Sequence, residues 1–248
     1  MAQHLVYKFY AELDDYKPNI WRRFEVTGNK TMAELGYILM TLFEMQASHL
    51  FCFTFDFGTG VMDKLRESYS YEDISRVLDD SYLAAIQKRW RFELPFEEIF
   101  ESENEKSFDA RRYRLSDISK TKPLQFTFEY DFGDSWRVSL TLESCEKLEI
   151  HASELPRALE GAGFGIIEDC GGVHGLYELA QAFTKKKGSE YDEYREWLGV
   201  DELDLDAFNL DDMNFRLKKL PRIFRESYEY GYTPTQRSID LIERKYMK

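Results

Sequence analysis

Two alternating segments separated by a short polar loop are the feature that most constrains how this chain can fold. Apolar and polar side chains alternate along residues 125–130 and again along residues 136–143, and this period of two is typical of strands with one buried face. The five residues between them read Asp-Phe-Gly-Asp-Ser and predict a hairpin loop. With Tyr130 opposite Trp136, the same register pairs a glutamate with an arginine on the polar face. The sequence therefore predicts an antiparallel β-hairpin.

A second hairpin is expected at the start of the chain. Residues 5–13 and 20–26 alternate in the same way and flank a turn-forming cluster at residues 14–19. Thr31 then begins a predicted helix, because Glu34 follows three residues later, as in a capping box, and an apolar stripe comes after it.

The rest of the chain is expected to add a strand and several helices. Phenylalanine at every second position over residues 51–57 predicts the strand. Residues 71–100 are interpreted as one or two helices interrupted near Pro95, and residues 101–106 as a polar connector. The glycine-rich residues 161–165 predict a flexible loop. Further helices are predicted over residues 173–185, 191–198 and 206–220, with a short one after Pro234.

These elements predict an α+β fold in which antiparallel β-hairpins form a curved sheet packed with helices, followed by a helical C-terminal region. We expect an α+β core over residues 1–185. Residues 186–248 are expected to form a helical extension that packs on the core and is not an independent domain. Aromatic residues make up 16% of the 248 residues, so much of the core should be aromatic.

Composition narrows the choice of compartment and partner. The net charge is −13, and an acidic surface repels phosphate backbones, which argues against nucleic acid as a partner. The three cysteines are odd in number and widely spaced, so neither a disulfide framework nor a zinc finger is expected. The chain shows no signal-peptide pattern and no apolar run of bilayer length. We therefore expect a cytoplasmic protein with no membrane partner, whose ligand is a protein or a small molecule.

Charge is unevenly distributed near the C-terminus. Residues 196–212 contain seven acids and no lysine or arginine, whereas residues 213–248 contain nine lysines or arginines and four acids. Two solvated helix faces that attract each other would explain this pattern. A basic contact surface for a partner is the alternative.

No complete catalytic motif is present in the sequence. Asp131-Phe132-Gly133 matches the metal-binding triplet of kinases, but the glycine-rich phosphate loop and the H-R-D loop are missing. Residues 161–165 lack the spacing of a dinucleotide-binding turn, and there is no G-x-S-x-G elbow. The basic residues are too scattered to predict the cationic pocket of a recombinase. The sequence therefore assigns no catalytic residue.

The strongest polar cluster consists of carboxylates. Four acids lie in two loops that can approach one another: Asp131, Asp134, Glu168 and Asp169. If they converge, they are candidates for a Mg²⁺ site, because this ion prefers oxygen ligands. The alternative is structural: the first two would bond loop amides, and the last two would cap the following helix.

Four further residues complete a candidate binding groove. Trp21 and Trp136 offer stacking surfaces beside the carboxylates and Arg22 offers a cation, although buried packing is the commoner role of such aromatic residues. His49 has no metal-site or triad spacing with the other histidines. A buried, hydrogen-bonded role at a helix end is therefore favoured for His49.

Three strings, in this order, resemble a known family. They are Pro-Asn-Ile-Trp-Arg-Arg at residues 18–23, followed by His-Leu at 49–50; Tyr-Asp-Phe-Gly-Asp-Ser-Trp at 130–136; and Glu-Asp-Cys-Gly-Gly at 168–172. Together they resemble the plasmid pRiA-type ORF-three-like family, whose members include TnpR-like passenger proteins of insertion elements. The resemblance runs from about residue 7 to residue 220. It implies a compact α+β fold and a link to mobile elements, but no defined activity.

The chain departs from this family where relatives carry metal-ligating side chains. Relatives have histidine, cysteine or proline at positions where this chain has Gly36, Phe51, Val138, Ala158, Gly165 and Ile166–Ile167. Of the soft-metal ligands only His49 and Cys170 remain. A structural zinc ion takes four nitrogen or sulfur ligands, so these replacements argue against a zinc site.

These observations lead to three functional hypotheses. An aromatic-rich α+β scaffold without a catalytic set favours a non-catalytic binding or adaptor module. The first alternative is a divalent-metal-dependent enzyme that acts on phosphate esters through the carboxylate cluster. The second is an accessory DNA-associated protein of a mobile element, which the acidic charge opposes. Convergence of the four acids is the feature that separates the first two hypotheses.

Overall fold

The computed structural model describes residues 3–56, 69–70, 73, 89–95, 104–118 and 124–244. Its eight strands form one open sheet in the order β5-β4-β3-β6-β7-β1-β2-β8. β4 and β5 run parallel, and every other neighbouring pair of these strands is antiparallel. The strands are Gln3–Leu13 (β1), Trp21–Thr27 (β2), Phe51–Phe55 (β3), Arg89–Glu93 (β4), Glu105–Asp109 (β5), Gln125–Tyr130 (β6), Trp136–Glu149 (β7) and Arg157–Ala162 (β8).

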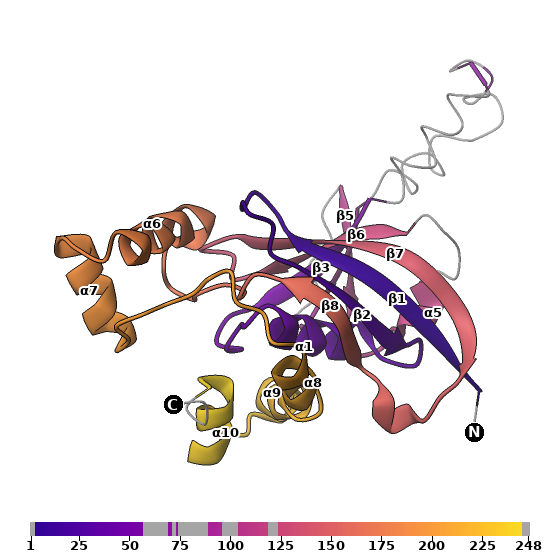
Figure 1. Cartoon of the computed structure of the whole chain (residues 1–248). Helices are drawn as coiled ribbons and strands as arrows, with labels where there is room; N and C mark the ends of the chain where they lie inside the picture. The colour runs from indigo at the N-terminus through magenta and orange to yellow at the C-terminus, as the bar shows by residue number, and fades with distance from the viewer. Residues whose placement is uncertain are drawn as a thin grey trace.

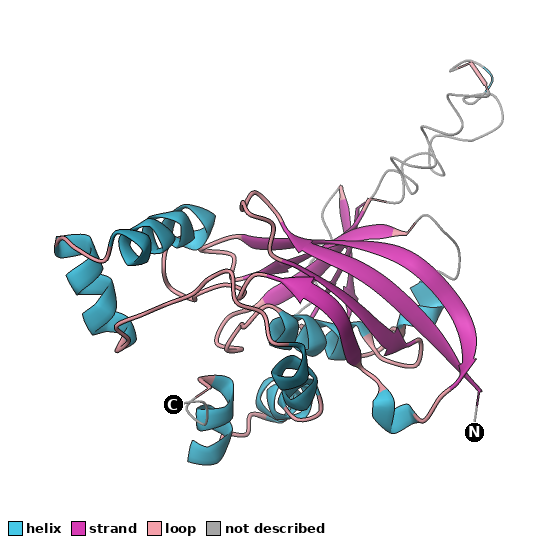
Figure 2. Cartoon of the chain, in the orientation of Figure 1, coloured by secondary structure: helices cyan, strands magenta, loops and turns pink. Residues whose placement is uncertain are grey.

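Helix α1 lies between the sheet and the C-terminal helices α8 and α9 (Figures 1 and 2). Every residue of α1 except Glu34 is buried, because apolar elements cover the helix on opposite sides. α6 and α7 extend from one end of the sheet (Figure 1). The helices are Met32–Leu42 (α1), Leu115–Ile118 (α5), Gly172–Lys185 (α6), Ser189–Leu198 (α7), Leu210–Leu217 (α8), Leu220–Tyr230 (α9) and Gln236–Ile242 (α10), with a 3-10 turn at Ala152–Glu154.

The predicted α+β fold and both predicted hairpins are confirmed. β1 pairs antiparallel with β2, and β6 pairs with β7 in the expected register, with Tyr130 opposite Trp136. The predicted capping box is also present: the Thr31 hydroxyl accepts from the amide of Glu34 at 3.1 Å, and the Glu34 carboxylate accepts from the amide of Thr31 at 3.0 Å.

Residues 71–100 were predicted to be helical, but Arg89–Glu93 form the strand β4, so the prediction is wrong there. The remainder of that range lies largely outside the described residues. Trp90 and Phe92 alternate with charged side chains and lie opposite Phe55 and Phe53 of β3, so aromatic pairing across the sheet decides the conformation. The predicted polar connector over residues 101–106 is also wrong at its end, because β5 begins there, parallel to β4.

Two further predictions need correction. Residues 161–165 do not form a loop throughout, because Gly161 and Ala162 belong to β8. A Cβ on Gly161 would lie 2.8 Å from the Trp21 carbonyl oxygen, so glycine permits the close approach of β2. The sequence predicts a single helix over residues 206–220, but the structure has two helices in this region. The first is α8, which Asn209 caps, and the second is α9, which extends beyond the predicted range.

The acidic stretch near the C-terminus pairs with three cations. Glu202 pairs with Lys186, Asp201 with Arg195, and Asp212 with Arg244. The last pair brings the basic C-terminal segment onto the acidic stretch. No helix in the described ranges combines the length and hydropathy that crossing a bilayer requires.

Candidate functional site

The loop between α1 and β3 carries His49 and is held at both ends by C-terminal residues. At its start, the buried carboxylate of Glu44 pairs with Arg216 and with Arg244. At its end, the hydroxyl of Tyr228 in α9 donates a hydrogen bond to the carbonyl of His49. The position of the histidine therefore depends on elements far along the chain.

Glu168 is a buried carboxylate that ties the same loop to the segment before α6. Its oxygens accept hydrogen bonds from the Gln46 amide at 2.6 Å, from the Tyr130 hydroxyl at 2.5 Å and from the Ser48 hydroxyl. The structural alternative, in which it caps the following helix, is wrong, because Gly171 is the N-cap and no side chain caps α6. Three donors use most of the acceptor capacity of Glu168, so its main role is to support the loop.

Tyr130 links this carboxylate to the backbone of the histidine loop. Its hydroxyl oxygen accepts from the amides of Ser48 at 3.0 Å and His49 at 3.3 Å. Burial, and then the negative charge of Glu168, raise the pKa of Tyr130, so the hydroxyl stays protonated and remains a donor at neutral pH. The His49 ring meets the Tyr130 ring edge-on, with centroids 5.8 Å apart.

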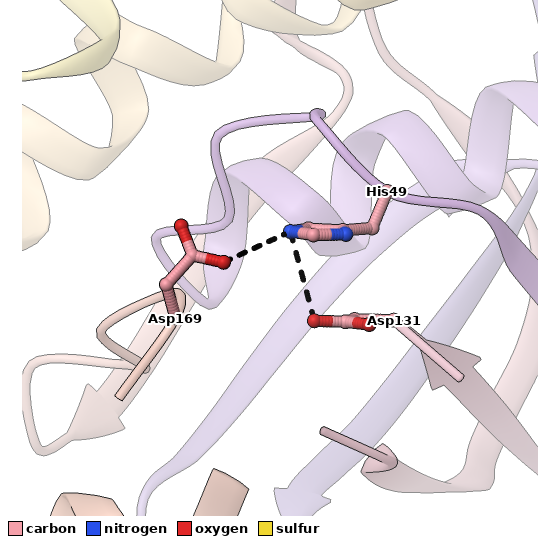
Figure 3. Close-up of side chains that lie close together, drawn as sticks. All are labelled: His49, Asp131 and Asp169. Atoms are coloured by element: carbon pink, nitrogen blue, oxygen red, sulfur yellow. Dashed lines mark ion pairs between the residues drawn. The ribbon is translucent and has the colours of Figure 1, made fainter. Parts of the chain in front are cut away.

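Three donor groups from three loops converge beside this network (Figure 3). His49 Nε2 lies 3.6 Å from Asp131 Oδ2 and 3.4 Å from Asp169 Oδ1, and one ligand atom from each residue lies within 4.8 Å of the others. The two distances exceed those of good N–H···O hydrogen bonds. Donors bound at about 2.1 Å from one metal ion lie about 3.0–3.4 Å apart, which is close to these two nitrogen–oxygen distances.

The cluster opens to solvent on one side. The side chains of His49 and Asp131 are 30% and 12% exposed, whereas that of Asp169 is 70% exposed. Both aspartates have left-handed backbone conformations, with φ of 55° and 62°, which aspartate tolerates better than most residues. Asp131 Oδ1 accepts from the amide of Gly133 at 3.0 Å, as the structural alternative predicts, while Oδ2 faces the histidine.

Asp134 does not join this cluster of three donors. Its Oδ2 is buried and has no hydrogen-bond partner among the residues that the structure describes. Its charge acts instead on Cys170: burial, and then Asp134, raise the pKa of this thiol to about 12. A Cβ on Gly172 would lie 2.6 Å from the Asp134 carbonyl oxygen, so the two acid-bearing loops pack tightly here. The predicted convergence therefore holds for the loops but not for all four acids.

Arg22 and Trp136 do not line a groove, because both side chains are completely buried. Trp21 is half-buried and stacks on the ring of Tyr10 at 5.5 Å. Arg22 donates hydrogen bonds of 2.7–2.8 Å to the backbone carbonyls of Trp21, Leu42, Ala162, Gly163 and Phe164. Its role is therefore to join β2 to the end of α1 and to the end of β8.

Two positions at which the resemblance implies histidine contact each other in this fold. A Cβ on Gly36 would lie 2.6 Å from Cε2 of Phe51, so the phenylalanine ring fills the space of a side chain at position 36. Val138 is buried as well and lies opposite Phe128. The three positions at which the resemblance implies histidine are therefore occupied by a glycine and two buried apolar side chains.

The sequence matches the plasmid pRiA4b ORF-3-like protein family over residues 5–212. The chain belongs to this family. It is 34% identical over 107 residues to the uncharacterized protein y4hQ of Sinorhizobium fredii (strain NBRC 101917 / NGR234), which covers 43% of this chain and 54% of y4hQ. The chain thus matches about half the length of that relative.

A protein of unknown function from Methanosarcina mazei Go1, MM3350, has a similar crystal structure. The TM-score is 0.63 with 22% identity, covering 85% of this chain and 98% of that chain. At this identity the likeness shows a shared fold. The three clustered donors lie within the family-matched residues, whereas Arg216, Tyr228 and Arg244 lie beyond them.

Sequence reasoning missed the residues that support the site. Glu44 and Tyr228 carry no motif, and their roles depend on contacts with residues far away in the chain. Tyr130 belongs to the family string at residues 130–136, and this was a signal in the sequence that it could matter for the site. No role was predicted for it. His49 was expected to be buried and hydrogen-bonded, whereas its imidazole is partly exposed and faces two aspartates.

Proposed function

We propose that the chain is a binding module whose site takes a divalent metal ion through His49, Asp131 and Asp169. The observation that supports this proposal is the spacing of the donors. The imidazole nitrogen lies 3.4 and 3.6 Å from the two carboxylate oxygens, longer than a good hydrogen bond and close to the separation of ligands around one ion. The supporting network of Tyr130 and Glu168 pre-organises the loop that carries the histidine.

The donor set favours one class of ion. One imidazole nitrogen and two carboxylate oxygens suit a first-row transition ion such as Mn²⁺ better than Mg²⁺, which prefers an all-oxygen shell. Three protein donors leave further coordination positions open. An oxygen ligand from a small molecule or from a partner protein would complete the shell, which is how the ion would serve a binding or adaptor role.

An enzyme that acts on phosphate esters through four carboxylates has less support. Glu168 already accepts three hydrogen bonds, and Asp134 lies apart, next to Cys170. A DNA-associated role is opposed by the net charge of −13.

Thermal unfolding with added Mn²⁺, Zn²⁺ or Mg²⁺ tests the proposal. An ion at about a hundred times its dissociation constant should add roughly 2.7 kcal/mol, a rise in Tm of roughly 5–10 °C for a chain of this size. Asp169→Asn should abolish the rise, because the amide loses the charge while asparagine still tolerates the left-handed backbone.

A matched control is available on α6. His174 and Glu178 form an exposed pair 3.6 Å apart, so the double variant His174→Ala/Glu178→Gln removes a histidine and an acid away from the site. It should keep the full metal response. The proposal fails if no metal raises Tm, or if the Asp169→Asn protein responds like the unmodified chain.

A further inference from the structure

A groove lies next to the cluster and is lined by the segment before α6, the C-terminal end of α7 and the end of α10. It encloses about 510 Å³, within the range of small-molecule pockets, roughly 300–1,000 Å³. Its walls are about half apolar, and the apolar part includes Phe164, Ile167, Leu198 and Val200. We call it the α7–α10 groove.

The groove carries more negative than positive side chains. Its charged lining residues are Glu44, Glu168, Asp169, Glu243 and Arg244, four acids against one base, and Glu44 pairs in addition with Arg216 behind the groove lining. Arg244 is already engaged by two carboxylates, those of Glu44 and Asp212. Within the described part of the chain, no lysine or arginine pairs with Glu168 or Asp169, and the imidazole of His49 lies near both carboxylates. The charge of the groove is therefore suited to a cation.

An exposed indole lines the same groove. Trp197, near the end of α7, is 48% exposed, which is unusual for a side chain of this size. Tryptophan is the best aromatic partner for a cation, and such contacts contribute about 0.5–1 kcal/mol at exposed sites. An exposed indole, carboxylates and apolar side chains that line one groove match the chemistry of organic ammonium recognition.

We propose that the α7–α10 groove binds an organic cation with an apolar body, such as a primary alkylamine. Its ammonium group interacts with the carboxylate of Asp169 and the ring of Trp197. Its hydrocarbon body packs on Ile167, Val200 and their apolar neighbours. The net charge of −13 raises the local concentration of cations around the protein, which favours the same class of ligand.

Asp169 belongs to both the groove and the metal-ion cluster. A metal ion on this carboxylate would repel an ammonium group beside it, so the two ligands should weaken each other reciprocally. The amine proposal itself does not depend on the metal proposal, because the groove, its charge and its indole are present in either case.

Calorimetric titration of the full chain in EDTA at neutral pH tests the amine proposal. The probes are n-hexylamine, 1-hexanol and hexanoate, which share the hydrocarbon chain and differ in the charge of the head group. Hexylamine should bind saturably and about ten-fold more tightly than hexanol, and hexanoate should bind most weakly. Trp197→Ala and Asp169→Asn should each weaken hexylamine binding roughly three- to ten-fold.

Two exposed residues that do not line the groove provide controls. Tyr232, 65% exposed, and Glu178, with a side chain 58% exposed, match the replaced aromatic and acid. Tyr232→Ala and Glu178→Gln should leave hexylamine affinity unchanged. Equal affinities for hexylamine and hexanol, preference for hexanoate, or absence of saturable binding would overturn the proposal. Because EDTA removes metal ions, these outcomes are independent of whether the metal proposal holds.

Discussion

The N-terminal end of helix α1 is capped by side chains close to it in sequence, although the amides of Met32 and Ala33 also donate to the carbonyls of Tyr113 and Ala110. Its C-terminal end is held by charged side chains from distant elements. At the first end, Thr31 and Glu34 form the capping box, and Lys30 pairs with Glu34 at 2.9 Å. At the other end, Arg22 from β2 donates to the carbonyl of Leu42 at 2.8 Å. The groups at the first end are partly exposed, whereas Arg22 is completely buried.

Glu44, just beyond the last turn of α1, also makes buried charged contacts with distant elements. The side chains of Glu44 and Arg216 are 4% and 1% exposed, and Arg244 adds a second guanidinium 2.5 Å from Glu44. This end of the helix leads into the loop that carries His49. Removing one partner of a desolvated charge costs far more than removing one from an exposed pair. Substitutions at the two ends should therefore differ in size and in their dependence on pH.

Replacing Arg22 should have the largest effect. Arg22→Met is expected to destabilise the protein by more than about 4 kcal/mol, because buried carbonyls lose their donors. The guanidinium also lies over the rings of Phe43 and Phe208, at 5.4 and 4.4 Å. Burial lowers the pKa of Arg22 to about 9, so the side chain is still charged at neutral pH. Urea unfolding followed by circular dichroism measures the loss.

The neighbouring arginine is the matched control for this variant. Arg23 has a side chain 25% exposed and pairs with Glu143 at 2.8 Å and with Glu160. Arg23→Met should cost less than about 1 kcal/mol, as expected for a partly exposed pair. Similar losses of stability in Arg22→Met and Arg23→Met would contradict the idea that burial makes the contacts of Arg22 the stronger ones.

Replacing Glu44 should have the next largest effect. Glu44→Gln leaves Arg216 as a buried charge without a carboxylate, and the expected loss is about 3–5 kcal/mol. The rise in Tm on metal addition should shrink too, because the loop that carries His49 loses the ion pairs that hold its first residues in place. Urea unfolding and thermal scans with Mn²⁺ measure the two effects.

An exposed helix pair serves as the reference for Glu44. Glu226 pairs with Arg222 one turn away, and the arginine side chain is 84% exposed. Glu226→Gln should cost at most about 0.5 kcal/mol and leave the metal response intact. If Glu44→Gln is equally mild, the buried pair does not hold the loop.

The local features of this fold were predictable because each depends on residues a few positions apart. The β6–β7 register follows from alternation on both sides of a five-residue loop, and the capping box from Thr31 and Glu34. The strands β4, β5 and β8 were not predicted. β4 is placed by its pairing with β3, and β8 by a close approach to β2 that glycine permits.

The candidate site was predictable only in part, for the same reason. Asp131 and Asp169 stood out as acids in turn-forming strings, and both reach the cluster. Asp134 looked equivalent in the sequence, but the packing of Gly172 against its carbonyl places it beside Cys170. The part played by His49 could not be inferred from spacing, because the histidine is positioned by contacts from α9 and from β6.

Replacing Glu34 should have the smallest effect and a distinctive pH dependence. Burial opposes the ionisation of Glu34, but hydrogen bonds from Lys30 and Thr31 and the charge of Arg225 outweigh it and lower the pKa of Glu34. Because the folded pKa lies below the unfolded value of about 4.3, the ionised carboxylate adds stability above that value. This stability is lost as pH falls through the folded pKa.

Glu34→Gln isolates the contribution of the carboxylate charge to stability, because glutamine can still accept the hydrogen bond from the Thr31 amide. The loss should be roughly 0.5–1 kcal/mol at neutral pH and should vanish on acidification, which urea unfolding at pH values down to about 3 would follow. The Arg22→Met loss should persist over the same range, since neither its guanidinium nor its carbonyl partners titrate there. If the loss of stability in Glu34→Gln does not change with pH, hydrogen bonds and not the charge of Glu34 stabilise the N-terminal end of α1. An Arg22→Met loss that faded on acidification would remove the contrast between the two ends of α1.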